Sequence, residues 1–346
     1  MNQKMAISVL FVVLVCFSCT PPAPVEETQP LPPTTLELLN QSLSPGINLG
    51  NALDAPAEGK WGVVIKDEYF EIIKDAGFNS VRVPVRWSAH TDTLAPFTID
   101  SVFMARVHYV IDMALKHDLT VVVNTHHYNS LFNAPAEHLE RLLAIWHQIG
   151  QSFATYPAQL VFEPLNEPHA KLTPALWNEW MPILTKELRS TNPDRTLMFG
   201  TANWGGISKL DSLVIPETER NVIVTVHYYD PYHFTHQGAS WSEGSDEWLG
   251  LTWAAEGEQL AQMGKDFDKI KAYSVKNNRP IYMGEFGAFS TVDTTSRVAW
   301  TSQVVQESEK RGFSWAYWEF CSGFGVYDSE SDTYRDFLLK ALIQDK

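Results

Sequence analysis

Leu160-Val-Phe-Glu-Pro-Leu-Asn-Glu-Pro168 begins as a short apolar strand and ends in acidic, amide and proline residues. Pro168 has no N–H to offer a neighbouring strand, so strand pairing is expected to stop about there and to leave Glu167 at the strand's C-terminal end. A second run, Pro280-Ile-Tyr-Met-Gly-Glu-Phe-Gly287, stops on Glu285. A single glutamate in this position often only caps the following helix. Two strands that both finish on a glutamate instead suggest a pair of carboxylates that act together.

Similar apolar runs recur along the chain and alternate with longer helical patterns. The helical stretches repeat apolar residues at three- and four-residue steps, as in Leu139, Leu142, Leu143 and Trp146. The predicted helices are Val102–His117, Glu137–Thr155, Ala175–Ser190, Glu258–Asn277 and Ser296–Arg311. The predicted strands are Gly46–Leu49, Ser80–Val85, Thr120–Asn124, Leu160–Glu163, Thr196–Gly200, Val222–His227, Ile281–Glu285 and Phe313–Trp318.

Strands that alternate with helices eight times over roughly 300 residues are typical of the α/β class, and specifically of a (β/α)8 TIM barrel. An open doubly wound sheet is the alternative. Its first strand is normally followed by a glycine-rich phosphate turn, and Gly46-Ile-Asn-Leu-Gly-Asn51 lacks that spacing. No linker, repeat or low-complexity run follows Leu36, so we predict a single domain over residues 36–346.

The ends of the predicted strands are the place to look for a site, because active sites of such barrels lie at the C-terminal strand ends. Polar and aromatic residues do gather there. In chain order they are Asn51, Arg82 and Arg86, His126 and His127, Asn166 and Glu167, His227 and Tyr229, Glu285 and Trp318. Scattered polar residues would not fall so often where apolar strands stop, so the two glutamates are interpreted as functional.

The composition restricts the possible partners. A formal net charge of −15 over 346 residues argues against binding of nucleic acid or of an anionic membrane surface by electrostatics. Neutral substrates suit such a surface better than phosphorylated ones. The chain also has 12 Trp, and exposed indole rings offer flat apolar faces on which a sugar can stack.

The N-terminal segment predicts export. Residues 1–19 have a positive start and a short apolar run, as in a signal peptide. Phe17-Ser18-Cys19 resembles a bacterial lipoprotein processing site, which would make Cys19 the lipidated N-terminus; an ordinary signal peptide cut nearby is the alternative. Residues 20–35 are rich in proline and predict an extended tether. We therefore expect an exported protein, either a cell-envelope lipoprotein anchored to a membrane through Cys19 or a secreted one.

Paired carboxylates without metal-ligand spacing suit glycoside hydrolysis, in which one acid stays protonated and the other stays ionised. Glu167 is interpreted as the acid, because Asn166 beside it can hold a sugar hydroxyl. Glu285 is interpreted as the nucleophile, which Tyr229 could orient. Arg82 could keep Glu285 ionised, although pairing with a buried Glu163 is an alternative, and the two roles are compatible.

Other hydrolytic chemistries have weaker support. His126 and His127 invite a metal interpretation, but adjacent strand residues point to opposite faces. The sequence has no HExxH motif and no cysteine cluster, so we expect no metal and no cofactor, and we assign the histidines to sugar hydroxyls. A serine hydrolase is disfavoured because there is no G-x-S-x-G elbow.

Several motifs together resemble family 5 of the glycoside hydrolases. They are Asn48-Leu-Gly-Asn51, Val81-Arg-Val-Pro84, Asn124-Thr-His-His127, Leu165-Asn-Glu-Pro168, His227-Tyr-Tyr-Asp-Pro231, Gly284-Glu-Phe-Gly287 and Trp315-Ala-Tyr-Trp318. They cover about residues 45 to 320 in the order of the family. The resemblance implies a core set of Arg82, His126, Asn166, Glu167, His227, Tyr229, Glu285 and Trp318, and a cis peptide bond after Trp318.

A narrower resemblance lies in the loop from His227 to Trp241, which is similar to that of endoglucanases that also tolerate mannan. It implies sugar contacts from His127, His236 and Trp241, and from Asn51 and Asp54 on the first loop. Glu319 departs from the family, since many members carry a small residue there. The long segment from Asp230 to Trp253 is expected to form one wall of the cleft. Stacking on sugar or packing in the protein are both open for Trp87, Trp204 and Trp253.

The sequence thus predicts an exported, monomeric, retaining endo-β-1,4-glycanase that acts on β-linked polysaccharides, mainly β-glucan and also mannan. A β-mannanase and a barrel that binds polysaccharide without turnover are the alternatives. Hydrolysis with retention of the anomeric configuration requires the carboxyl groups of Glu167 and Glu285 to face each other at roughly 5 Å. A distance of ~6.5–9.5 Å between them would favour inversion of that configuration.

Overall fold

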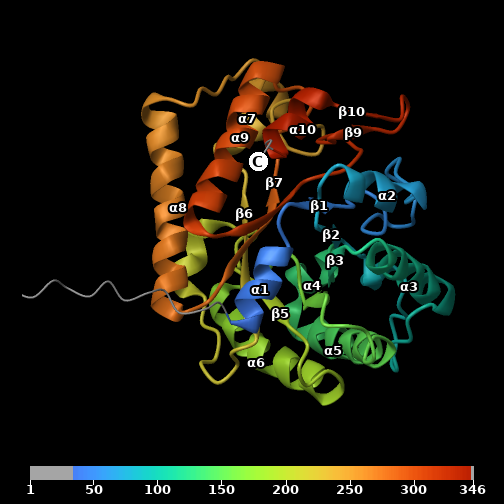
Figure 1. Cartoon of the computed structure of the whole chain (residues 1–346). Coiled ribbons are helices and arrows are strands. Elements are labelled where there is room, and N and C mark those ends of the chain that lie inside the picture. Colours follow the sequence, from blue (N-terminus) through green and yellow to red (C-terminus); the bar gives the residue numbers. More distant parts are fainter. Residues whose placement is uncertain (1–33, 344–346) are drawn as a thin grey trace, which may run out of the picture. The chain divides into compact units, whose positions relative to one another are not determined.

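The computed structural model describes residues 34–343, and within them eight parallel strands close into a barrel (Figure 1). The strands follow one another around the barrel in chain order, and β8 pairs with β1. Their bounds are β1 Gly46–Asn48, β2 Ser80–Val83, β3 Thr120–Asn124, β4 Leu160–Glu163, β5 Leu197–Gly200, β6 Val222–Tyr228, β7 Ile281–Phe286 and β8 Ser314–Tyr317. The predicted (β/α)8 barrel is confirmed, with strand ends that differ from the prediction by at most two residues.

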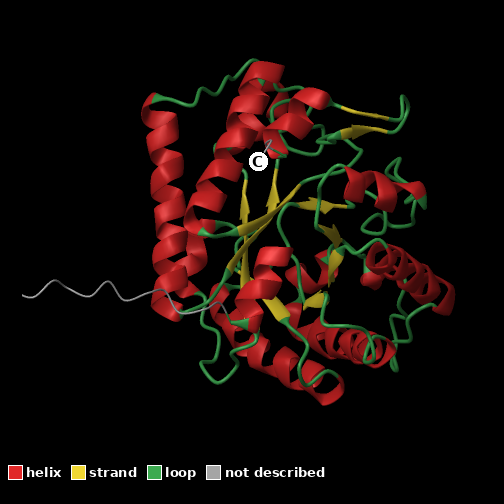
Figure 2. Cartoon of the chain, in the orientation of Figure 1, coloured by secondary structure: helices red, strands yellow, loops and turns green. Residues whose placement is uncertain are grey.

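Helices surround the strands (Figure 2). The five predicted helices correspond to α3 Ser101–Lys116, α5 Pro135–Ser152, α6 Pro174–Thr191, α8 Gly257–Asn277 and α9 Thr294–Arg311. Shorter helices that the periodicity did not reveal are α1 Thr35–Ser42, α2 Glu68–Asp75, α4 Asn129–Asn133, α7 Tyr232–Thr235 and α10 Asp336–Leu342. A small antiparallel pair, β9 Tyr327–Asp328 and β10 Thr333–Tyr334, follows the barrel.

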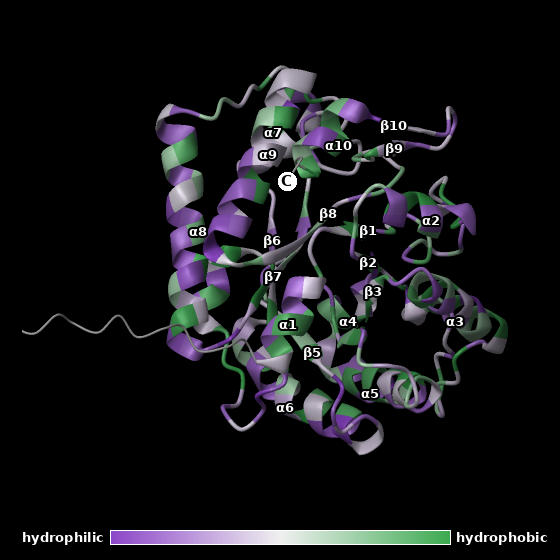
Figure 3. Ribbon diagram, viewed as in Figure 1, coloured by the Kyte–Doolittle hydropathy of each residue, from purple (hydrophilic) through white to green (hydrophobic). Residues whose placement is uncertain are grey.

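The helices form because their apolar residues fall on one side. In α3 the buried residues are Phe103, Val107, Val110, Ile111 and Ala114, which lie three and four positions apart and pack inward. The outer helices α8 and α9 accordingly carry mixed hydrophilic and hydrophobic residues along their length (Figure 3). The strands are buried throughout, as expected for a parallel sheet covered by helices.

Side-chain caps fix where several helices begin. The N-cap residues Asp100, Thr173 and Asp293 each accept a hydrogen bond from a backbone amide in the first turn of α3, α6 and α9, respectively. A cap of this kind is worth ~1 kcal/mol. In the chain, α6 follows β4 and α9 follows β7. Fixing the first turns of these two helices therefore also fixes the length of the loops that connect them to the barrel.

The N-terminal mouth of the barrel is closed by α1. Asn40 of α1 donates to the carbonyl of Ile281 and accepts from Ser314, so it binds the starts of β7 and β8. Ser80 at the start of β2 donates to the carbonyl of Leu43. Leu43 joins a buried cluster inside the barrel with Val122, Val161, Met198, Ile223, Tyr282 and Ala316. One end of the barrel is therefore sealed, and the opposite end carries the polar residues.

Several predictions about the N-terminal segment lie outside the described residues, namely the signal peptide, Cys19 and most of the tether. Among the described helices, none combines the length and the apolar character that a membrane span requires. Cys321 is a free, partly buried thiol.

Candidate active site

The two glutamates meet at the open end of the barrel. Glu285 is the fifth residue of β7, whereas Glu167 lies in the loop four residues beyond the end of β4. This loop is held by the backbone amides of Asn203 and Trp204, which donate to the carbonyl of Pro168. One carboxylate oxygen of each glutamate and a ring nitrogen of His227 lie within 4.8 Å of one another. This separation matches the one predicted for retention and is too short for inversion.

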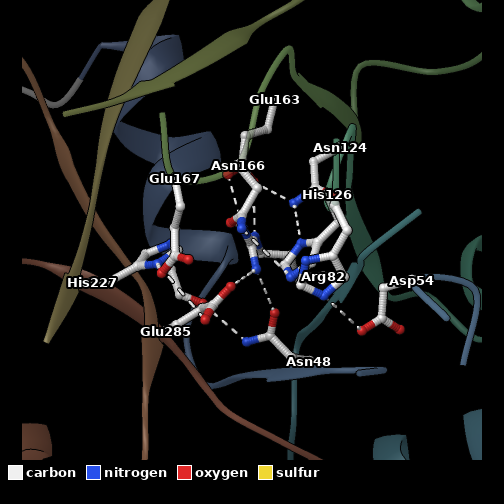
Figure 4. Close-up of polar contacts among 12 residues, drawn as sticks. Asn48, Asp54, Arg82, Asn124, His126, Glu163, Asn166, Glu167, His227 and Glu285 are labelled. Carbon is white, nitrogen blue, oxygen red and sulfur yellow. Dashed lines mark hydrogen bonds and ion pairs between the residues drawn. The ribbon is translucent and has the colours of Figure 1, made fainter. Parts of the chain in front are cut away.

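Arg82 of β2 is fully buried, and its guanidinium lies between the carboxylates of Glu163 and Glu285 (Figure 4). Its Nε and Nη2 donate to the two carboxylate oxygens of Glu163 at 2.7 and 2.8 Å, and its Nη1 donates to Glu285 at 2.6 Å. The remaining donors bind Oδ1 of Asn48 and Oδ1 of Asn166. All five N–H groups of the guanidinium are thus used. The two roles weighed for Arg82 hold together, since it pairs with Glu163 and supports Glu285.

The surroundings of Glu285 favour its ionised form. Burial alone would raise its pKa, but the charges of His227 and Arg82 and a hydrogen bond from Tyr229 outweigh burial and hold the pKa below the usual 4.5. The Tyr229 hydroxyl donates to Oε2 of Glu285 at 3.0 Å. An ionised carboxylate fixed by two donors on separate oxygens is in the state and orientation that a nucleophile needs.

The surroundings of Glu167 favour its protonated form. Burial raises its pKa above the usual 4.5, the hydrogen bond from His227 opposes this, and the negative charge of Glu285 adds to the rise. Nδ1 of His227 lies 2.7 Å from Oε1 of Glu167 and 3.7 Å from Oε2 of Glu285. His227 therefore sits between the two carboxylates, whose pKa values move in opposite directions. Such a difference in pKa assigns Glu167 as the proton donor and Glu285 as the carboxylate that stays ionised.

These shifts predict a bell-shaped pH dependence of kcat/KM. The acidic limb follows protonation of Glu285 and should lie below pH 4.5, while the basic limb follows ionisation of Glu167 and should lie above pH 4.5. Tyr229→Phe removes one hydrogen bond to the ionised Glu285, so it should move the acidic limb to higher pH. Rate profiles of the parent and Tyr229→Phe enzymes test this. An acidic limb that does not move would show that Tyr229 leaves the pKa of Glu285 unchanged.

His126 and His127 do not point apart, and the sequence-based argument for their orientation was wrong. Both follow the end of β3, where strand alternation no longer applies, and their rings make an edge-to-face contact with centroids 4.6 Å apart. Nε2 of His127 lies 4.0 Å from Oδ2 of Asp54. One possible ligand atom each from Asp54, His126 and His127 lie within 4.8 Å of one another. These three atoms are therefore close enough together to surround a cation, and whether they could bind one depends on their hydrogen bonds.

Hydrogen bonding at His126 disfavours metal binding. The amide of Asn124 is oriented by the backbone N–H of Val85, which donates to its Oδ1, and by Glu163, which accepts from its Nδ2. That Nδ2 lies 3.2 Å from Nδ1 of His126. On the other side of the ring, Nδ2 of Asn166, whose Oδ1 accepts from Arg82, lies 3.5 Å from Nε2. Burial lowers the pKa of His126 well below 6.5, which keeps the ring neutral. Amide NH2 groups of the protein thus lie at both ring nitrogens, the positions at which a cation would have to bind.

The indole of Trp318 forms the floor of the cleft beside these histidines. His126 stacks on it with centroids 5.5 Å apart and planes 5° apart. The backbone N–H of Trp318 donates to the carbonyl of Phe286. A Cβ added at Gly50 would lie 2.8 Å from the indole, so only glycine fits beneath it. The peptide bond between Trp318 and Glu319 is cis, as the resemblance predicted.

The remaining predicted contact residues come from two loops. Asp54 accepts from the backbone amides of Asn51 and Ala52, and burial raises its pKa to about 7 despite these hydrogen bonds. His236 and Trp241 lie on the predicted wall between β6 and α8, and Trp241 is exposed. His236 and Trp241 both pack against Phe324. Within residues 34–343, the predicted catalytic and sugar-contact residues thus lie on loops or toward strand ends at the open mouth of the barrel.

Of the three tryptophans with two possible roles, two belong to the protein interior. Trp87 and Trp253 are buried, whereas Trp204 is 56% exposed and stacks on His169 with centroids 3.5 Å apart. Nδ1 of His169 in turn binds the carbonyl of Glu167. Trp204 therefore extends the cleft on the side of the acid.

Some site residues were missed by the sequence reasoning. Trp61 is 41% exposed and makes an edge contact with His127, and no strand end marks it in the sequence. Asn48 binds Arg82 and donates to the carbonyls of Gly284 and Tyr317. Asn48 and Asn124 belong to the motifs that resemble the family, and each is the last residue of a buried strand. A polar amide at the end of a buried strand could have identified them in the sequence.

Comparison with known proteins adds independent findings. A family model described as Cellulase (glycosyl hydrolase family 5) matches residues 45–323. Endoglucanase H of Acetivibrio thermocellus is 34% identical over 303 residues, which cover 86% of this chain and 32% of that protein. Cellulase/esterase CelE of the same organism is 30% identical over a region that covers 84% of this chain and 36% of the length of CelE. The chain thus spans about a third of the length of these two relatives.

Solved structures align over nearly the whole described part. Thermotoga maritima Cel5A in complex with cellobiose is 53% identical with a TM-score of 0.88, covering 89% of this chain and 99% of its own. The same protein in complex with mannotriose also aligns at 53% identity, with a TM-score of 0.87 and the same coverage. A hyperthermophilic endo-β-1,4-glucanase in complex with substrate aligns at 44% identity with a TM-score of 0.88, over 90% of this chain and 100% of that one.

Proposed function

The chain belongs to the cellulase family, glycosyl hydrolase family 5, and on this premise we propose that it is an endo-β-1,4-glucanase that retains the anomeric configuration. The observation that carries the proposal is the glutamate pair, whose oxygens approach within 4.8 Å and whose pKa values are displaced in opposite directions. Endo action is proposed from the similarity to endoglucanases.

The proposed reaction has two steps. In the first, Glu285 attacks the anomeric carbon while Glu167 gives its proton to the departing oxygen of the polysaccharide. In the second, Glu167 is ionised and accepts a proton from water, which attacks the anomeric carbon and releases Glu285. His227, within hydrogen-bond distance of Glu167, is placed to stabilise its ionised state in the second step. Arg82 and Tyr229 hold Glu285 in place throughout.

A binding protein without turnover is the alternative from another class. A pure sugar-binding cleft has no need for a buried arginine and a tyrosine directed at one carboxylate. Release of reducing ends from carboxymethyl cellulose or barley β-glucan distinguishes the two possibilities. Failure to release reducing ends from any β-1,4-linked polysaccharide would refute the proposed hydrolysis.

Mannan is expected as a second substrate, with kcat/KM within about 10²-fold of that for glucan. Glucose and mannose differ at C2, and the candidate contacts around the floor of the cleft are short polar groups such as Asn51, Asp54 and His127. These can meet either hydroxyl position, with water bridging the rest. The crystal structures of Cel5A with cellobiose and with mannotriose support this proposal. Undetectable hydrolysis of β-mannan under conditions that cleave β-glucan would contradict it.

We further propose that the protein is exported and anchored through a lipid on Cys19. The support comes from the sequence of residues 1–19 alone. Cys19→Ala should abolish incorporation of labelled fatty acid in a bacterial host and move the protein from the membrane fraction to the soluble exported fraction. Cys321→Ala is the matched control and should keep the label. An unlabelled parent protein with a mature N-terminus other than Cys19 would show ordinary signal cleavage instead.

A further inference from the structure

Glu319, the residue that departs from the family pattern, organises the loop after β8. Its side chain is completely buried, and its carboxylate accepts hydrogen bonds from the backbone amides of Cys321, Ser322 and Phe324 at 2.8–3.1 Å. Among the described residues, no lysine, arginine or histidine forms an ion pair with it. Burial raises its pKa to about 7. A buried carboxylate is costly, so its three amide donors mark a purpose-built turn.

One product of this turn is a hydrogen bond between the loops that follow the neighbouring strands β8 and β1. The turn places Ser322 so that its hydroxyl accepts a hydrogen bond from Nδ2 of Asn51 at 2.7 Å. Asn51 has a left-handed backbone with a φ of 64°, and its own backbone N–H donates to Asp54. The Asn51 side chain in the loop after β1 is thus bound to Ser322, and the position of Ser322 depends on Glu319.

The second product is the position of the Phe324 ring. This ring packs against Tyr229, His236, Trp241 and Phe289, with centroids 5.4 to 6.2 Å apart. Trp241 in turn makes an edge contact with Phe289. Phe324 therefore joins the loop after β8 to the wall between β6 and α8.

The Trp318 indole is held by other contacts. It is packed against Gly50, stacked with His126 and bonded through its backbone to Phe286. A change in the Glu319 carboxylate should therefore disturb Asn51 and Trp241 before it disturbs the floor of the cleft. The route from the turn to Glu285 is longer, through the edge contact of Phe324 with Tyr229 and the hydrogen bond from Tyr229.

We propose that Glu319 is a positioning residue that sets the sugar-binding geometry of Asn51, through Ser322, and of Trp241, through Phe324. The inference rests on the proposed glycanase function. It also predicts which sugars are affected. Glu167 protonates the leaving group from the side of β4, so the departing sugars lie toward Trp204. The retained sugars then lie over the opposite side, near β8 and β1, where Asn51 and the Glu319 turn meet.

The test uses Glu319→Gln, which keeps the shape of the side chain but directs an NH2 group at backbone N–H donors. With 2,4-dinitrophenyl β-cellobioside, whose two sugars occupy the retained side, KM should rise about 10-fold while kcat stays within about 3-fold. Glu307→Gln is the matched control, because Glu307 is a buried glutamate on α9 whose side chain binds Gln303 and Arg311 of the same helix. It should leave both constants unchanged.

Ser322→Ala provides a second measurement that does not disturb the Glu319 turn. Ser322→Ala alone should raise KM about 3-fold to 10-fold. In the double variant with Glu319→Gln, KM should rise by less than the product of the two single effects, because both substitutions act on Asn51 through Ser322. A fall in kcat and in Tm without a change in KM would mean that Glu319 is only structural. An unchanged KM in Ser322→Ala would likewise overturn the link to Asn51, whether or not Glu319→Gln folds.

Binding without turnover separates this inference from the proposed function. In a Glu285→Gln background, the Kd for cellotriose measured by calorimetry should rise about 10-fold on adding Glu319→Gln. If the parent protein hydrolyses nothing, the proposed function fails while this measurement still reports on Glu319. If the parent hydrolyses glucan and neither KM nor Kd changes, the inference on Glu319 fails alone.

Discussion

Glu285→Ala is expected to lower kcat/KM by ~10⁵-fold or more on both polysaccharide and aryl glycoside substrates. The variant removes the atom that bonds to the anomeric carbon, and an activated leaving group cannot replace it. The other groups that would support the reaction, Arg82 and Tyr229, lose the carboxylate to which they donate. Initial rates with barley β-glucan and with 2,4-dinitrophenyl β-cellobioside measure the loss.

Rescue by azide makes this result specific to a missing nucleophile. The small anion can occupy the space left by the carboxylate and attack the aryl glycoside from the same face, giving an α-glycosyl azide. The matched control is Glu307→Ala, a buried glutamate of α9 whose loss should leave the rate unchanged. Residual activity near 1% of the parent, with a β-configured product, would exclude Glu285 as the nucleophile.

Glu167→Ala should divide the substrates into two groups. Polysaccharide cleavage should fall ~10³-fold or more, because a sugar alkoxide needs a proton to depart. The first step on 2,4-dinitrophenyl β-cellobioside should be largely spared, because dinitrophenolate departs without that proton. The second step still suffers, since the same residue is the base for water.

A glycosyl-enzyme should therefore accumulate in Glu167→Ala. Mass spectrometry should find two added hexose units on the peptide that contains Met283-Gly-Glu-Phe286. Azide should accelerate breakdown of this intermediate and give a β-glycosyl azide, the opposite anomer from that expected with Glu285→Ala. Two results would mean that the two roles are reversed. One is an equal loss of rate on the polysaccharide and on the aryl glycoside in Glu167→Ala, and the other is a sugar covalently bound to Glu167 in the parent enzyme.

The barrel could be predicted from the sequence because each of its strands is locally encoded. β3 and β4 were placed at their observed bounds, since each contains a short apolar run, residues 121–123 and 160–162, that ends at a polar residue. The site could be located for a related reason. In a closed parallel barrel every strand ends at the same mouth, so Arg82, Asn166 and Glu285 must come together although they are far apart in the chain.

Features made by contacts between distant loops could not be predicted. The orientation of His126 depends on Asn124, whose own amide is fixed by Val85 and Glu163. The stacking of Trp204 on His169 joins loops after different strands, and nothing in either stretch indicates the partner. Glu319 was read only as a departure from a pattern, because its meaning lies in backbone amides that come into reach after the loop has folded.

The guanidinium of Arg82 also limits how much the site can adapt to its ligand. With all of its N–H groups bonded to the protein, it offers no donor to a sugar, and Glu285 cannot rotate away without breaking a charged hydrogen bond. The side chains beneath the cleft therefore have little conformational freedom left to lose when a polymer arrives. The ordering cost of binding falls on the polysaccharide itself, whose glycosidic torsions must be fixed. At equal contacts, a stiffer chain should then bind this enzyme more tightly than a flexible one.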